Sequence, residues 1–116
     1  VPEIDFDEEL LNLRFQGMQF SEDTKASMNN YLFKGWMPGG HLEAQFAYDY
    51  ERALYNADIH NRKVFWSIAM WIRENAPAEC QGSYAAVEAY AKDKEAQERF
   101  RVECEKKAMW KTLERS

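Results

Sequence analysis

The feature that most constrains the fold is the stretch GWMPGG, residues Gly35–Gly40, together with the segment that follows it. Three of the five glycines and one of the three prolines in the chain fall within this stretch. Residues 41–75 then contain neither glycine nor proline. Because proline stops a helix and glycine weakens one, the sequence predicts a sharp turn that opens a long helical segment.

Two interpretations of residues 41–75 fit the pattern of apolar side chains. Apolar residues recur at helical spacing from Leu42 to Ile72, and polar residues interrupt them between Asn56 and Asn61. One interpretation is a single helix of about 35 residues and about 50 Å. The other is two helices with a break near Asn56–Asp58, where Asp58 caps the second helix. The absence of glycine and proline favours the single long helix.

Capping residues predict further helices on both sides of this segment. Ser21 precedes two acidic residues and predicts a helix that runs to about Phe33 and stops at Gly35. Pro77 ends the long segment, and Ser83 predicts the start of another helix over residues 84–93.

The last part of the chain predicts one more helix, rich in charged residues. This helix runs from residue 94 to about Leu113, with Phe100, Cys104 and Ala108 on its inner face. Salt bridges expected between residues four apart on it are Glu95–Arg99 and Glu103–Lys107. Alternating patterns typical of strands are absent after residue 20. We therefore predict an all-α fold, a compact helical bundle of four or five helices that includes the long helix 41–75.

Length and charge divide the chain into an acidic N-terminal arm, residues 1–20, and a single helical domain, residues 21–116. The arm carries five acidic residues and one basic residue, whereas the rest carries fifteen acidic and fourteen basic residues. We expect the arm to become ordered only when it docks. Because the chain has no basic excess, generic DNA binding is not expected.

The chain also has the composition of a cytoplasmic protein. Its two cysteines, Cys80 and Cys104, are too few for a disulfide framework. No apolar run is long enough to span a membrane, and no signal peptide is visible. We expect Cys80 to lie in a loop as a free thiol.

Three segments carry a recognisable series of turns. They are YLFKGWMPGGHLEA, RALYNADIHN and RENAPAECQGSYAAVEAYAKD, and together they span about Asn29 to Asp93. The pattern is a Gly…Pro-Gly-Gly turn, an Ala-Asp…Asn helix and an Ala-Pro…Gly-Ser turn. It resembles a group of small proteins from tailed phages and prophages, although Gln81 stands where a Trp is expected. The resemblance implies a phage origin and an all-α fold, and it implies no activity.

Two predicted helix starts are candidates for binding an anion. Pro38 and two glycines precede the helix at His41, and Gly82 precedes Ser83 in the same manner. Free N–H groups at helix starts attract phosphates. If both starts face one side, they flank a single nucleotide-like ligand, although ordinary turns between helices are the simpler explanation. The residues concerned are Gly39, Gly40, His41 and Ser83, with Trp36 and Tyr84 for base stacking and Arg62, Lys63 and Arg73 for phosphate.

Residues that support catalysis or metal binding form no recognisable set. Two histidines and no cysteine pair give no closed zinc site, and the serines and cysteines lack an evident base and orienting group. We therefore predict no enzyme activity, no metal and no cofactor.

Polar residues beside the apolar stripe are expected to form a buried hydrogen-bond network, or alternatively a polar pocket: Asp49, Asn56, Asp58, His60 and Asn61.

The high aromatic content favours a function in binding. Aromatic residues make up 15% of the chain, so that some are expected on the surface, where they are typical of interfaces. We predict a non-enzymatic protein that acts in the cytoplasm of the infected bacterium and inhibits or redirects a host protein. Candidate contacts are Trp36, Met37, Trp66, Trp71 and the arm residues Phe6, Leu10 and Leu11.

Two other functions are compatible with the sequence. One is a sponge that sequesters a phosphate-bearing nucleotide signal at the two helix starts, and the other is a helper of virion assembly. A long helix with many aromatic residues also predicts self-association into a homo-oligomer, because so short a chain cannot bury both sides of it.

Overall fold

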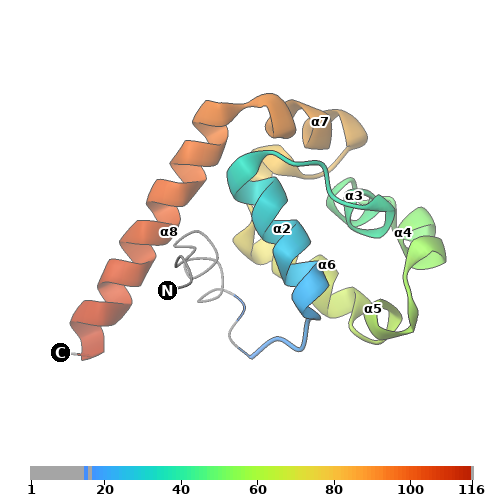
Figure 1. The fold of residues 1–116 in the computed structure, drawn as a ribbon, viewed down its shortest axis with the longest axis horizontal. Helices are drawn as coiled ribbons and strands as arrows, with labels where there is room; N and C mark the ends of the chain where they lie inside the picture. Colours follow the sequence, from blue (N-terminus) through green and yellow to red (C-terminus); the bar gives the residue numbers. More distant parts are fainter. Residues whose placement is uncertain (1–14, 16, 116) are drawn as a thin grey trace, which may run out of the picture.

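The computed structural model describes residue 15 and residues 17–115, with side chains as far as residue 107. This part of the chain contains α-helices, one short 3₁₀ turn and no strand, which confirms the all-α fold (Figure 1). The seven α-helices exceed the predicted four or five. In chain order the elements are α2 (Glu22–Lys34), α3 (Gly40–Phe46), α4 (Tyr50–Asn56), α5 (Ile59–Lys63), α6 (Phe65–Asn75), η1 (Ala78–Cys80), α7 (Tyr84–Lys92) and α8 (Lys94–Arg115).

The predicted long helix over residues 41–75 is wrong, because four short helices, α3 to α6, occupy this segment. Asp49 caps α4 by accepting a hydrogen bond from the Arg52 amide, and Asp58 caps α5 by accepting one from the Asn61 amide. The alternative break at Asp58 is therefore confirmed. Short acidic side chains bond the backbone locally and so compete with helix continuation.

Packing explains why the segment folds back on itself. A helix of about 50 Å would exceed the longest dimension of the described molecule, whose principal extents are 45 × 30 × 30 Å. Its apolar stripe would also reach only one side of the core. Divided into short helices, the same stripe places Leu42, Phe46, Ile68 and Ile72 in one buried cluster.

Helix α2 lies at the centre of that cluster and matches its prediction. Ser21 caps it by accepting a hydrogen bond from the Thr24 amide, and Gly35 ends it in a left-handed conformation. Met28, Tyr31 and Leu32 are fully buried. Because α2 contacts α3, α7 and α8, it fixes the relative positions of the other elements.

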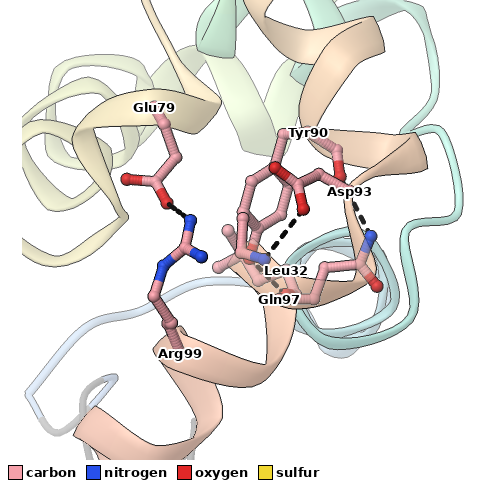
Figure 2. A network of polar contacts seen from close by, with 7 residues as sticks. Leu32, Glu79, Tyr90, Asp93, Gln97 and Arg99 are labelled. Atoms are coloured by element: carbon pink, nitrogen blue, oxygen red, sulfur yellow. Dashed lines mark hydrogen bonds and ion pairs between the residues drawn. The ribbon is translucent and has the colours of Figure 1, made fainter.

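The corner between α7 and α8 packs against the end of α2 (Figure 1). Figure 2 shows the polar contacts that hold this corner. The Tyr90 hydroxyl donates to the Leu32 carbonyl, and Gln97 Nε2 donates to the Tyr90 carbonyl at 2.9 Å. Asp93 Oδ1 accepts from the Ala96 amide at 3.0 Å and so caps α8. These contacts join α2, near the start of the described residues, to α7 and α8, near their end.

Helix α8 begins and ends close to where the sequence predicts. Phe100 and Cys104 are buried, as expected for its inner face, whereas the Ala108 side chain lies outside the described residues. The Glu103–Lys107 salt bridge is present at 3.8 Å. The expected Glu95–Arg99 pair is wrong, because Arg99 bonds Glu79 of η1 at 3.2 Å instead (Figure 2).

Two residues near the end of the predicted arm pack against the helices. Phe15 and Phe20 are buried, and the Phe15 ring stacks on Trp71 with 4.6 Å between centroids. Trp71 is itself fully buried, so its predicted role as an exposed contact is wrong. The arm residues Phe6, Leu10 and Leu11 lie outside the described residues. In the described part, none of the helices combines the length and apolar character needed to span a membrane.

Candidate functional site

The candidate site begins at the tight turn between α3 and α4. Tyr48, in this turn, has a φ of 65° and is the one residue other than glycine with a positive φ among the described residues. A bulky side chain in this region is strained, and such strain gathers at functional sites. Because the chain reverses here, Tyr48 and Tyr50 are brought together with 6.1 Å between ring centroids.

Helix α6 completes a surface that we name the aromatic–arginine patch and define as Tyr48, Tyr50, Trp66, Met70 and Arg73. The Trp66 ring lies 5.5 Å from the Tyr50 ring, and the Arg73 guanidinium carbon lies 4.2 Å from the Tyr48 ring centre. Met70 lies one helical turn from both Trp66 and Arg73. The exposed fractions of Trp66 and Met70 are 67% and 53%, so two large apolar side chains face solvent beside a cation.

Hydrogen bonds hold the Arg73 side chain in place within the patch. Its Nε and Nη2 atoms both donate to the Tyr50 hydroxyl, at 3.0 and 2.6 Å. The guanidinium also lies over the rings of Tyr48 and Tyr50, an arrangement that favours a cation. The hydrogen bond to Tyr50, followed by its charge interaction, raises the pKa of Arg73. Among the described residues, no acidic side chain contributes to that rise.

Gln81 anchors the other end of the Tyr48 side chain. Its Oε1 accepts from the Tyr48 hydroxyl at 2.6 Å. Its Nε2 lies within hydrogen-bond distance of three carbonyl oxygens at the end of α6, of which that of Ile72 is nearest at 3.0 Å. The Gln81 side chain thus links Tyr48 to the helix that carries Arg73.

A second polar group borders the turn. The Tyr84 hydroxyl donates to Asp49 Oδ2 at 2.7 Å, and this hydrogen bond is the main cause of the raised pKa of Tyr84. Arg52 lies over the Tyr84 ring at 5.5 Å and contacts its hydroxyl. One face of the Tyr84 ring is therefore taken by an arginine of the same chain.

The two helix starts that the sequence paired do not share one hollow. A hollow of about 420 Å³ is lined by Gly39, Gly40 and His41, and Ser83 is not among its lining residues. Ser83 caps α7, as predicted. The preceding residue, Gly82, donates its amide to the Phe46 carbonyl, so α7 begins beside the opposite end of α3.

The chemistry of this hollow does not suit a phosphate. Asp23 and Asp58 line it, and its lining includes no lysine or arginine among the described residues. Burial lowers the pKa of His41, more than Asp58 raises it, so His41 is not a strong positive group at neutral pH. The Ser21 and Asp58 side chains already accept hydrogen bonds from amides at two of the surrounding helix starts.

Other residues singled out in the sequence lie apart from one another. Trp36 and Met37 are 60% and 46% exposed on the loop before α3, with Lys34 over the Trp36 ring at 5.2 Å. Arg62 and Lys63 are exposed on α5. Of the predicted binding residues, the structure therefore brings Trp66 and Arg73 into one patch.

The expected buried network of polar residues in the stripe is wrong, but the alternative of a polar pocket is met by four of the five residues, since Asn56, Asp58, His60 and Asn61 line the hollow at the start of α3. Asp49 and Asp58 cap separate helices, and the Asn56 side chain bonds the Arg52 carbonyl of its own helix. Asn61 Oδ1 accepts from the Thr24 hydroxyl at 3.1 Å.

Cys80 is a free thiol, as expected, although it lies at the end of η1 rather than in an open loop. Cys80 is fully buried, and burial raises its pKa. In the described residues no group of three or more acidic, histidine or cysteine side chains is placed to hold a metal.

Several residues at the surface, of which Tyr50 is half-buried and the others are exposed, were missed at the level of sequence. They are Tyr48, Tyr50 and Met70 of the patch and a second apolar group on α4 and α5, formed by Leu54, Tyr55 and Ile59. Met70 was detectable, because it shares a helical face with Trp66 and Arg73. The two tyrosines were not, because Tyr50 was assigned to the buried stripe of a long helix and the turn at Tyr48 was not predicted.

Comparison with known proteins adds no relative. No family model, no curated protein and no solved structure matches the chain.

Proposed function

We propose that this chain is a non-enzymatic binding protein whose aromatic–arginine patch recognises another protein. The observation that carries the proposal is the patch itself, in which Trp66, Met70 and Arg73 are exposed beside two tyrosines. Tryptophan, tyrosine and arginine are the residues most enriched among energetic hot spots of protein interfaces. The resemblance to phage proteins suggests that the target is a host bacterial protein, which the chain inhibits or redirects.

The rigidity of the patch supports this function. Tyr48 is tied to Gln81, and Arg73 is tied to Tyr50, before any partner arrives. Side chains that are already ordered lose little conformational entropy on binding, and this lowers the cost of association. The left-handed backbone of Tyr48 also costs stability, which is typical of a residue retained for function.

The nucleotide sponge receives less support from the same structure. Its two helix starts line different parts of the surface, and the described residues that line the hollow at the first start include two carboxylates and neither a lysine nor an arginine. Phosphates need the opposite balance of charge. Virion assembly has no specific observation in its favour.

A pulldown with matched variants tests the proposal. The tagged chain, Trp66→Ser and Val102→Ser are incubated with bacterial lysate, and captured proteins are identified by mass spectrometry. Trp66 and Val102 are both exposed helical residues, on α6 and α8 respectively. Both native residues have nearly the same helix propensity as serine, so both variants change the helices little.

We expect a captured protein to be retained by Val102→Ser and lost by Trp66→Ser. Removal of one hot-spot tryptophan costs about 2 kcal/mol or more, which is about 30-fold in affinity. A partner that Trp66→Ser retains fully would show that the patch is not the binding surface. A Trp36→Ser variant tests in parallel whether the loop before α3 contributes.

A further inference from the structure

Arg73 is an exposed cation that has no acidic partner among the described residues. The salt bridges of this part of the chain join Lys25, Arg99, Arg101 and Lys107 to glutamates. Arg73 instead contacts two tyrosines. A guanidinium in an otherwise apolar patch therefore keeps its charge available for an acidic group from outside.

The geometry of Arg73 leaves part of its guanidinium free to bind. Nε and Nη2 both donate to a single oxygen, the Tyr50 hydroxyl, and Nη1 has no hydrogen bond within the described structure. The guanidinium plane is held by its position over the Tyr48 ring at 4.2 Å. A carboxylate accepts two parallel hydrogen bonds from such a fixed guanidinium, and the fork geometry makes the pair specific.

We propose that the aromatic–arginine patch binds a peptide segment in which an aspartate or glutamate lies next to a large apolar side chain. This inference rests on the proposed function and names the chemistry of the partner. The carboxylate binds Arg73, and the apolar side chain packs on Trp66 and Met70, which are one helical turn from each other. Charge complementarity therefore selects the acidic residue, while the exposed apolar surface selects its neighbour.

A carboxylate fits this surface better than a phosphate does. Asp49 lies between the two tyrosines in the chain, and it is held by the Tyr84 hydroxyl at 2.7 Å. The nearby cation Arg52 contacts that same hydroxyl and lies over the Tyr84 ring. Arg73 is therefore the one cation of the patch as defined, and a single guanidinium balances the one charge of a carboxylate but leaves one charge of a doubly charged phosphate unbalanced.

Selection from a displayed library of random 12-residue peptides tests the inference. The wild-type chain is the bait, and the best peptide is synthesised together with a twin in which each Asp or Glu is replaced by Asn or Gln. Fluorescence anisotropy then measures the Kd of both peptides for the wild type, Arg73→Gln, Arg73→Lys and Trp66→Ser. Arg99→Gln serves as control, because Arg99 is an exposed arginine already paired with Glu79.

We expect the selected peptides to share an acidic residue beside an apolar one. Replacement of the acid in the peptide, or Arg73→Gln, is expected to raise Kd about tenfold or more. Arg73→Lys is expected to restore only part of the affinity, since an ammonium group lacks the planar fork. Arg99→Gln should leave Kd unchanged, and circular dichroism should show that every variant is folded.

Two outcomes would overturn the inference in different ways. If Trp66→Ser abolishes binding but neither Arg73→Gln nor the uncharged twin changes Kd, the patch binds proteins without reading a carboxylate. If no peptide is enriched, or if Trp66→Ser and Arg73→Gln both bind as the wild type does, the patch is not a peptide-binding surface. In that case the proposed function fails as well.

Discussion

Gly35 is the first residue of the GWMPGG stretch and the glycine of this turn that leaves least room for a side chain. Its replacement by alanine tests how closely the neighbouring helix approaches the turn. Gly35 ends α2 with a φ of 72° and a ψ of 23°. A Cβ atom built on it lies 2.3 Å from the Ala91 carbonyl oxygen and 2.5 Å from Gln97 Nε2. The substitution therefore meets two obstacles, a left-handed backbone and a backbone oxygen of α7 that cannot rotate away.

The two costs can be estimated separately. A residue with a Cβ atom in the left-handed conformation loses about 1–2 kcal/mol relative to glycine. Overpacking in a filled interior adds about 1–3 kcal/mol. Gly35→Ala is therefore expected to lower the free energy of unfolding by about 2–5 kcal/mol. At about 4 °C per kcal/mol, the melting temperature falls by roughly 8–20 °C.

Gly17 provides an internal control for the backbone term. It has a φ of 82°, and a Cβ atom added there meets nothing within 4 Å. Gly17→Ala therefore has the conformational cost alone, about 1–2 kcal/mol. Urea and thermal unfolding followed by far-UV circular dichroism measure both variants. If Gly35→Ala is no less stable than Gly17→Ala, the close approach of α7 to this turn is wrong.

Two further predictions concern stability. Gly39→Ser is expected to stabilise the chain by about 1 kcal/mol. The reason is that Gly39 caps α3 without a side-chain hydrogen bond and has open space around it. A midpoint of urea unfolding that does not rise would contradict this prediction. Burial raises the pKa of Cys80, Tyr31 and Tyr90, so the folded chain keeps protons that the unfolded chain loses above about pH 8.5 for the thiol and about pH 10 for the phenols. These groups should therefore leave the free energy of unfolding constant below about pH 8. At higher pH they should lower it, by up to about 1.4 kcal/mol per pH unit for each group. Urea titrations that show no loss of stability up to about pH 11 would refute the burial of these hydroxyl and thiol groups.

Helix ends were the most predictable part of this fold. Ser21, Ser83 and Asp58 each accept a hydrogen bond from an amide three residues ahead. Such a bond is local, so the residue and its position suffice to predict it. The end of α2 at Gly35 is local for the same reason. The all-α class follows as well, because helical spacing repeats through most of the chain.

The candidate site was only half predictable. Trp66 and Arg73 were singled out as an exposed aromatic residue and a cation, and they share the patch. Tyr48 and Tyr50 join them because the chain turns between α3 and α4, at a residue with positive φ that no glycine marks. The salt bridge from Arg99 to Glu79, rather than to Glu95, shows the same limit, since its partner comes from a distant part of the chain.

The sequence by itself determined where helices start and stop at Ser21, Gly35, Pro77 and Ser83, because those signals act through the backbone of a few adjacent residues. Only the tertiary structure decided that residues 41–75 form four helices, and which of their aromatic rings are buried. Trp71 packs under Phe15, whereas Trp66, five residues earlier on the same helix, faces solvent. That choice depends on which face of each helix the rest of the chain can cover, and burial of apolar surface is a property of the whole assembly rather than of any short segment.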